Sequence, residues 1–229
     1  MCNLYGDPAN ARLLCGAVPG ASAAYTALNS RPLFLDGGAD IVYIGSMTER
    51  GQAMAARALA PYRGGISECV DGGVRFLVTG NALEVFGRYI DCEDGSRIEC
   101  LGLFDVYAKR DVARRYNGLY LGNYGEIEIV GFTSRFSHLY GDEDGALFET
   151  IRGVGRRPGE RAEGLRRVNF MASYVLGPLL ITNPLFAKEL LRDMGAGVTE
   201  LPFERAAMDA YNARLREFRN PKTGFDYGG

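Results

Sequence analysis

The segment at residues 74–88 has the pattern of a segment that presents a catalytic nucleophile. An apolar run over 74–78 predicts a buried strand, small residues over 79–81 predict a tight turn, and apolar residues at helical spacing follow over 82–86. Such a turn exposes a reactive side chain beside helix N-terminal amides, which stabilise an oxyanion. Gly80 lies at the apex, so the sequence predicts the backbone of such a site without its nucleophile.

Few other side chains can supply nucleophilic or general-base chemistry. The chain has a single histidine, His138, so any Cys–His or Ser–His pair must use it. We interpret His138 as a surface or packing residue in preference to a displaced base. The odd number of cysteines, without CxxC spacing, indicates reduced thiols and neither a disulfide framework nor a zinc site. These cysteines are Cys2, Cys15, Cys69, Cys92 and Cys100.

Length and composition predict one globular domain over residues 1–219, followed by a loose C-terminal tail at 220–229. The 229 residues are enough for a sizeable core, and 47% hydrophobic with 24% charged residues is typical of a folded domain. A formal net charge of −2 provides no general attraction to nucleic acid. No apolar run approaches the roughly 20 residues of a membrane span, and we see no signal peptide. We therefore expect a cytoplasmic protein that needs no metal or other cofactor.

The first half of the chain predicts alternating helices and strands. Asp7 is placed to cap a helix that begins at Pro8 and ends near Gly16. A short strand over 41–45, a helix over 50–62 and the strand over 74–79 then give two strand–helix units, which imply a parallel sheet. Ligands bind beyond the carboxyl ends of such strands. The candidate ligand-binding residues at that rim are Gly45, Ser46, Gly80 and Asn81.

The second half predicts an antiparallel extension and further helices. We expect a strand over 98–104, an antiparallel, half-exposed sheet over 119–131, and a strand over 168–175. A helix begins at Asn183 and Pro184, and an amphipathic helix follows Pro202. Its apolar stripe comprises Phe203, Ala207, Ala210, Tyr211, Leu215 and Phe218.

Two charged segments allow alternative interpretations. The acidic residues over 91–95 could ligate calcium, but their spacing is incomplete and a solvated hairpin turn is favoured. The arginines over 152–167 could contact phosphate or a partner. A solvated loop is favoured there, because no aromatic residues are interleaved with them.

An ordered set of motifs resembles the cobyric-acid-synthase type of class I glutamine amidotransferase, above all the amidotransferase subunit of bacterial lipid II isoglutaminyl synthase. NLYGDPAN at 3–10 is similar to the family's NLYGDxGN, and YVLGPLLITNP at 174–184 to its YLHGPLLPKNP. Between them, YIGSMTERGQ at 43–52, VTGNALEVFG at 78–87, IECLGLFDVY at 98–107 and the Gly131-Phe132 pair occupy the places of further family motifs. The resemblance implies a flavodoxin-like α/β fold with a mostly parallel sheet, and a Mur-ligase-like partner subunit.

The chain departs from this family at the residues that act on glutamine. The nucleophilic cysteine falls on Gly80, and the general-base histidine falls on Leu176. The oxyanion segment falls on Ser46 and Met47, and Thr133-Ser134-Arg135 replaces a Glu-Asn-His sequence. Losing one member of a comparable catalytic set costs roughly a factor of 10⁶ in rate. The resemblance therefore implies a pseudo-amidotransferase.

The resemblance implies that this chain keeps part of the family's ligand-binding site. Arg115 falls near the arginine that holds substrate glutamine, although a solvated charge at a strand entrance is the plainer interpretation. The amides of Asn81 and Ala82 are expected to open a helix and so to attract a carboxylate or phosphate. The family also has a strand ahead of the NLYGD motif. We expect either a start codon further upstream or a lost strand, whose exposed edge a partner or the tail would cover.

Three functions follow as hypotheses. The first is a catalytically degenerate subunit that docks with or regulates a Mur-ligase-like amidating enzyme of peptidoglycan metabolism. The second is an active glutamine-hydrolysing subunit that uses non-standard residues. The third is a sensor of glutamine, glutamate or another small anion.

Overall fold

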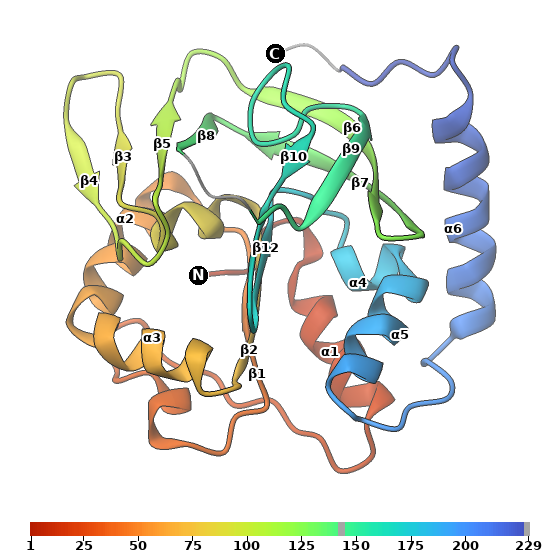
Figure 1. Ribbon diagram of the computed structural model, residues 1–229, viewed down its shortest axis with the longest axis horizontal. Coiled ribbons are helices and arrows are strands. Elements are labelled where there is room, and N and C mark those ends of the chain that lie inside the picture. Colours follow the sequence, from red (N-terminus) through yellow and green to blue (C-terminus); the bar gives the residue numbers. More distant parts are fainter. Residues whose placement is uncertain (142–144, 227–229) are drawn as a thin grey trace.

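A computed structural model, which describes residues 1–141 and 145–226, has a central sheet of four strands (Figure 1). The strand order is β1 (Ile41–Ile44), β2 (Arg75–Thr79), β12 (Phe170–Ser173) and β11 (Leu165–Arg167). The first three strands are parallel, whereas β11 pairs with β12 in the antiparallel direction. The predicted parallel strands at 41–45, 74–79 and 168–175 are thus confirmed within one or two residues at most ends.

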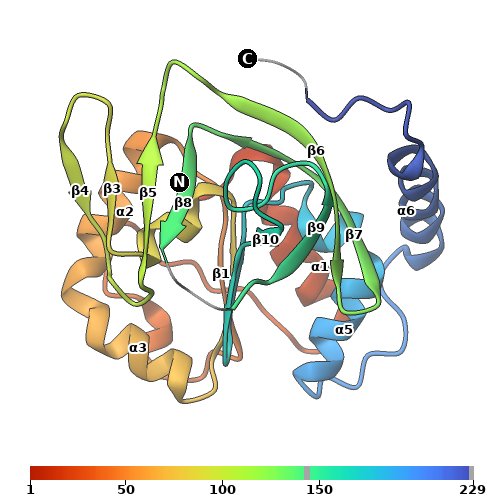
Figure 2. The same cartoon turned by 45° about the horizontal axis from the view of Figure 1, so that its top comes forward.

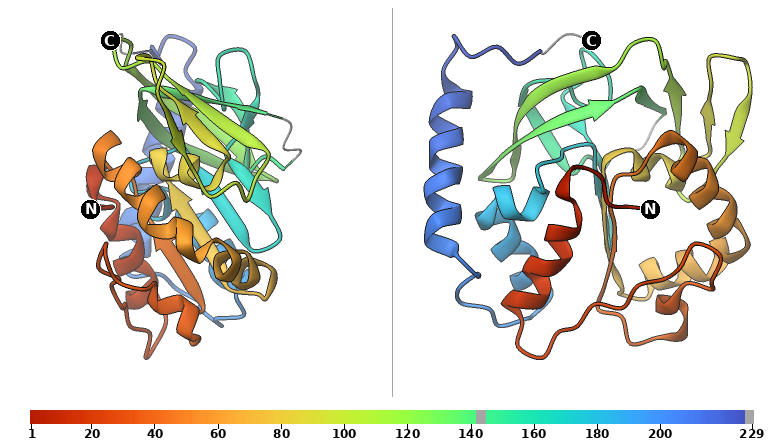
Figure 3. Two further views of the ribbon diagram at one scale, coloured as in Figure 1. Left: turned by 90° about the vertical axis from the view of Figure 1, so that its left-hand side faces the viewer. Right: turned by 180° about the vertical axis from the view of Figure 1, so that it is seen from behind.

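Helices cover both faces of the central sheet (Figures 1 and 3). One face carries α1 (Pro8–Ala17), α4 (Leu179–Thr182) and α5 (Pro184–Asp193). The other carries α2 (Glu49–Leu59), the 3-10 helix η3 (Ala60–Tyr62) and α3 (Arg63–Asp71). Two apolar cores result, one on each face. Side chains of β2 divide between them, because successive residues of a strand point to opposite faces. The fold is a mixed α/β arrangement of a parallel sheet flanked by helices.

Two further sheets lie beside the central one (Figure 2). The second sheet is antiparallel, in the order β10 (Ala162–Glu163), β9 (Phe148–Arg152), β6 (Tyr116–Tyr124) and β7 (Ile127–Arg135). The third sheet has the order β4 (Arg97–Glu99), β3 (Tyr89–Asp91), β5 (Val106–Arg110) and β8 (Ser137–Gly141). The hairpin of β6 and β7 confirms the antiparallel prediction for 119–131.

Several elements differ from the sequence prediction. The strand expected over 98–104 ends at Glu99, because the amides of Leu101 and Leu103 donate to the carbonyls of Val85 and Phe86 instead of to a sheet. The next strand, β5, was not predicted. Neither was α3, where Pro61 and two consecutive glycines weaken the helical pattern. Short 3-10 helices also form at η1 (Leu4–Gly6) and η2 (Leu33–Asp36).

The C-terminal helix α6 (Glu204–Arg219) packs on the outside of the second sheet (Figure 1). Tyr211, Leu215 and Phe218 of the predicted stripe form a third, small core with Leu121 and Val130. Phe203 and Ala210 are exposed, however, so the buried stripe is narrower than the sequence predicted.

Residues 220–226, the described part of the segment predicted to be a loose tail, are hydrogen-bonded to the second sheet. The amide of Leu119 donates to the carbonyl of Phe225, and the guanidinium of Arg152 donates to three carbonyls, those of Phe218, Asn220 and Thr223. The same guanidinium lies 4.0 Å from the centre of the Phe225 ring.

Candidate functional site

The predicted rim forms at the carboxyl ends of the parallel strands. Gly45 and Ser46 follow β1, Gly80 and Asn81 follow β2, and Leu176 comes shortly after β12. The strands are in register there, with Ile44 opposite Val78 and Ser173 opposite Thr79. Residues that are far apart in the sequence therefore meet at one place, and the candidate site is this rim.

The space around Gly80 is filled. Its φ of +65° is the left-handed conformation that a sharp strand-to-helix turn requires, and glycine adopts it without steric cost. A Cβ atom built at Gly80 would lie 2.5 Å from the Cβ of Ser46 and 3.2 Å from Cδ2 of Leu176. Both distances are shorter than ordinary van der Waals contact. The backbone thus has the bend of a nucleophile-bearing turn, but the position of the first side-chain atom is occupied.

The segment after the turn is a 3-10 helix, η4 (Gly80–Phe86), and not the predicted α-helix. The side chain of Asn81 bonds to both backbone polar groups of Met47: its Oδ1 accepts from the amide at 3.1 Å and its Nδ2 donates to the carbonyl at 2.8 Å. Ser46 and Met47, where the family has its oxyanion segment, are both buried. Asn81 therefore cross-links the two turns of the rim.

Asp7 is the charged residue nearest the centre of the rim. The sequence predicted it to cap α1, and this prediction is wrong, because its side chain makes no capping bond. Its fully buried Oδ2 instead accepts from the amide of Ser46 at 2.7 Å, the hydroxyl of Ser46 at 2.8 Å and the hydroxyl of Thr79 at 2.8 Å. Its Oδ1 is buried and has no hydrogen-bond partner among the described residues. A buried acidic side chain thus links the turns that follow β1 and β2.

A chain of polar contacts extends from Asp7 under the rim. The hydroxyls of Thr79 and Tyr43 lie 2.8 Å apart, and Nδ2 of Asn10 donates to the Tyr43 oxygen at 2.9 Å. Burial, reinforced by the negative charge of Asp7, raises the pKa of Tyr43 far above its usual value. Thr79 and Tyr43 are therefore neutral groups that position Asp7, and neither is a nucleophile or a base at neutral pH.

A second buried carboxyl lies on η4. Glu84 is fully buried and accepts from Gln52 at 2.8 Å, from the Tyr174 hydroxyl at 3.0 Å and from the Ser137 hydroxyl. Arg110 donates to the amide oxygen of Gln52. Burial raises the pKa of Glu84 above 4.5, although the hydrogen bonds from Ser137 and Gln52 oppose the shift. This network ties η4 to α2 and to the third sheet.

Leu176 follows β12 of the central sheet, and Arg115 directly precedes β6 of the second sheet. The backbone of Leu176 exchanges two hydrogen bonds with Phe132 of β7, which fixes the leucine side chain against Gly80. Arg115 is exposed, and its Nη2 donates to the hydroxyl of Tyr5 at 2.7 Å. Tyr5 in turn donates to Ser134 at 3.1 Å. Arg115 is therefore held at the outer edge of the rim.

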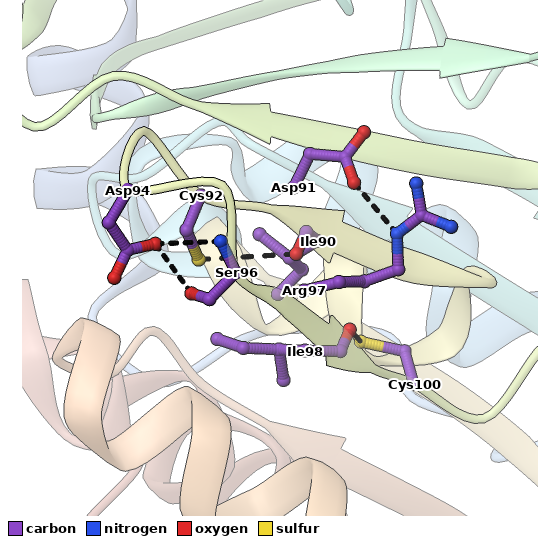
Figure 4. Close-up of polar contacts among 8 residues, drawn as sticks. All are labelled: Ile90, Asp91, Cys92, Asp94, Ser96, Arg97, Ile98 and Cys100. Carbon is purple, nitrogen blue, oxygen red and sulfur yellow. Dashed lines mark hydrogen bonds and ion pairs between the residues drawn. The ribbon is translucent and has the colours of Figure 1, made fainter.

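Three of the five cysteines have an environment that disfavours the thiolate. Burial raises the pKa of the thiols of Cys2 and Cys69, and it raises the pKa of Cys100 to about 12. The thiols of Cys92 and Cys100 lie near the carbonyls of Ile90 and Ile98 (Figure 4). A thiol whose pKa is raised carries little of the reactive thiolate at neutral pH.

His138 lies on β8 and is half-buried. Burial, together with the positive charge of Arg135, lowers its pKa to about 4. Its Nδ1 is buried without a hydrogen-bond partner among the described residues, and its ring lies 6.3 Å from that of Tyr116. No contact joins it to a cysteine in the described part of the chain, so this imidazole has a packing environment.

The acidic segment at 91–95 forms the turn of the β3–β4 hairpin, as favoured from the sequence. Figure 4 shows Asp94 accepting from the amide and hydroxyl of Ser96, and Asp91 accepting from Arg97. These carboxylates are satisfied within the hairpin. Across residues 1–141 and 145–226, no group of three or more His, Cys, Asp or Glu side chains is arranged to hold a metal ion.

The arginine-rich stretch over 152–167 is only partly a solvated loop. Arg156 is buried, with Nε donating to the carbonyl of Gly164 at 2.9 Å and Nη2 to that of Gly145 at 2.8 Å. Arg157 and Arg161 instead pair with acidic neighbours at the surface. The interpretation as solvated charge is therefore wrong for Arg156.

No protein-family model matches this chain. A curated protein does: the lipid II isoglutaminyl synthase (glutamine-hydrolyzing) subunit GatD of Staphylococcus aureus (strain N315) is 26% identical over 170 residues, which are 74% of this chain and 69% of GatD. The similarity supports a GatD-like amidotransferase family. Among solved structures, PurLQS from Thermotoga maritima aligns with a TM-score of 0.43 and 12% identity, over 77% of this chain and 80% of that one. Within the described residues, no helix combines the length and the apolar character that crossing a bilayer requires.

Sequence reasoning missed two parts of the site. The position of Asp7 before Pro8 predicts a helix cap, but its hydrogen-bond partners, Ser46 and Thr79, are distant in the sequence and cannot be inferred from local spacing. Glu84 lies in an apolar run, where a lone acidic residue at a helical position was a usable sign of a buried polar network.

Proposed function

We propose that this protein is a non-catalytic, glutamine amidotransferase-like subunit that docks with a Mur-ligase-like amidating enzyme of peptidoglycan metabolism. The similarity to GatD supports the amidotransferase-like family and, through the name of that protein, lipid II amidation as the process. The strand-and-turn rim at Gly45, Gly80 and Leu176 supports a class I, flavodoxin-like relationship. The five free cysteines fit a reducing compartment, and we propose the cytoplasm.

One observation is the main support for the loss of catalysis: a Cβ atom at position 80 would collide with neighbouring side chains. A nucleophile at Gly80 would put its Cβ 2.5 Å from that of Ser46. Glutamine hydrolysis needs a thiolate to attack the amide and a base to move the proton. The apex has no side chain, and Leu176 at the base position is apolar and packs toward it. This geometry supports the loss of both roles.

Two further features disfavour the alternatives. An active glutaminase with non-standard residues needs another thiol, yet the thiols of Cys2, Cys69 and Cys100 all have raised pKa values. A sensor of small anions would place its ligand beside the buried carboxylate of Asp7 and the amide of Asn81's side chain, which is already bonded to Met47. The docking role requires neither a reactive group nor an open pocket at the rim.

Ammonia release from glutamine tests the proposal. The purified chain is assayed alone and together with a co-expressed Mur-ligase-like subunit, and we expect a stable complex with no hydrolysis above the buffer rate. The variant Gly80→Cys with Leu176→His is expected to stay inactive, because Ser46 still fills the space. Hydrolysis by the wild-type chain that disappears on substituting a single cysteine contradicts the loss of catalysis. Failure to bind the ligase subunit contradicts the docking role alone.

A further inference from the structure

A cavity of about 520 Å³ is lined in part by α3. This helix is at the lower left of Figure 1. Its walls come from α3, from the loop at Gly102 and Leu103, and from the tight turn between β11 and β12. None of the rim residues lines it. The cavity has the volume of a small-molecule site, which is typically about 300 to 1,000 Å³. It therefore offers a binding site separate from the degenerate rim.

Two arginines from different elements are fixed at this cavity. Nη2 of Arg63 donates to the carbonyl of Gly102 at 2.9 Å, and Nη1 of Arg167 donates to the carbonyl of Leu103 at 2.9 Å. Because these two carbonyls belong to consecutive residues, both guanidiniums are held against one loop. Arg167 also lies 4.5 Å from the centre of the Phe104 ring. Their orientation is therefore set before any ligand arrives.

Neither arginine of this pair is engaged in an ion pair, although the carboxyl group of Asp71 also lines the cavity. Neither Arg63 nor Arg167 forms a salt bridge with any residue that the structure describes, and each guanidinium has five N–H donors. A second cavity, of about 440 Å³ on another side of α3, differs in this respect. Its arginine, Arg31, pairs with Asp36 at 3.0 Å. The arginine of the second cavity is thus paired with a carboxylate, whereas the two arginines of the first are not.

We propose that the cavity binds the phosphomonoester of a small, hydroxyl-bearing molecule. A phosphate monoester has three strong acceptor oxygens, so it can accept from the planar forks of both guanidiniums at once. Ser67 and Asp71 line the same cavity and provide hydrogen-bonding groups for the hydroxyls of the remainder. A monocarboxylate has two oxygens, which fill one guanidinium fork, and is the poorer ligand. The site does not depend on the function proposed for the rim.

Titrations of ¹⁵N-labelled protein with inorganic phosphate, glucose 6-phosphate and glucose at constant ionic strength test the site. We expect both phosphates to shift the amides of Ser67, Gly102 and Val168, with glucose 6-phosphate binding more tightly and glucose alone producing no shift. Arg63→Gln and Arg167→Gln should each weaken binding about tenfold or more, the value of one charge-assisted hydrogen bond. Arg214→Gln, an exposed position on α6, is the matched control and should leave binding unchanged.

Two more variants keep the test decisive. Arg63→Lys retains the positive charge but not the planar guanidinium fork, so it should also weaken phosphate binding. This variant provides a test if Arg167→Gln does not fold. Asp71→Asn removes a repelling charge, so it should strengthen binding of inorganic phosphate while reducing the advantage of glucose 6-phosphate. The proposal is overturned if phosphate shifts none of these amides, or if the shifts persist in both glutamine variants. Equal binding of the two phosphates would refute the role given to Ser67 and Asp71.

Discussion

Replacing Gly80 by alanine measures how tightly the apex is filled. The backbone at φ +65° costs an L-residue roughly 1 to 2 kcal/mol. The added Cβ would also lie 2.5 Å from the Cβ of Ser46, and overpacking of this kind costs roughly 1 to 3 kcal/mol. We therefore expect Gly80→Ala to lower the free energy of unfolding by about 2 to 5 kcal/mol.

The β3–β4 turn provides a matched control. Gly95 has a φ of +79°, and a Cβ atom there would meet nothing within 4 Å, so Gly95→Ala incurs the backbone cost alone. The difference between the two variants isolates the contact with Ser46. Urea unfolding followed by far-UV circular dichroism suits a chain without tryptophan. The reasoning is refuted if Gly80→Ala is no more destabilising than Gly95→Ala.

A double variant tests the same contact from the other side. Ser46→Gly removes the Cβ atom and leaves the Ser46 Cα, at 3.2 Å, as the nearest atom of that residue. It also removes the hydroxyl bond to Asp7, so it should be destabilising by itself. In the Gly80→Ala background, Ser46→Gly should lower the free energy of unfolding by less than it does in the wild type, with a favourable coupling of about 1 kcal/mol or more. Strict additivity would show that the two residues do not compete for space.

Three further predictions concern titration and the tail. Burial lowers the pKa of His138, so the ring proton signal of this single histidine should titrate near pH 4 by NMR; a midpoint near 6.5 contradicts its burial. Because the raised pKa of Glu84 makes the folded state hold its proton more tightly, the stability it contributes below pH 4.5 is lost as the pH rises. The free energy of unfolding of the wild type relative to Glu84→Gln should therefore fall as the pH rises above 4.5 in urea unfolding, and a difference that stays constant with pH refutes this. Arg152 holds residues 220–226 against the second sheet, so Arg152→Gln should speed hydrogen exchange of the Leu119 amide, which donates to Phe225, by about tenfold. Unchanged exchange would show that Arg152 does not hold this segment in place.

The local pattern was enough to locate the rim. Alternation of apolar strands and helices predicted β1, β2 and β12, and the rule that ligands bind beyond the carboxyl ends of parallel strands placed Gly45 and Gly80 together. Alternation also predicted antiparallel sheet over 119–131, where β6 and β7 pair in the structure. These features are encoded within about ten consecutive residues, which is the range over which side-chain spacing carries information.

What the sequence did not predict depends on contacts between distant residues. The apparent strand over 98–104 is diverted because the η4 carbonyls of Val85 and Phe86 compete for its amides. The side chain of Asp7, at the N-cap position of α1, makes no capping bond because Ser46 and Thr79 offer three donors to one of its oxygens. A single sequence shows the residue types involved but not these partners.

The third core is separate from the two larger ones, and this affects the order in which parts of the molecule unfold. Three buried side chains of α6 pack on the second sheet, and Tyr211 and Arg219 also bond to Glu128 of β7. The two larger cores contain no residue of α6. Regions with few buried apolar contacts open at a lower free energy than the global transition. The C-terminal arm is therefore expected to detach as a cooperative unit while the parallel sheet stays folded, and its removal would uncover the outer surface of β6 and β7 rather than the rim.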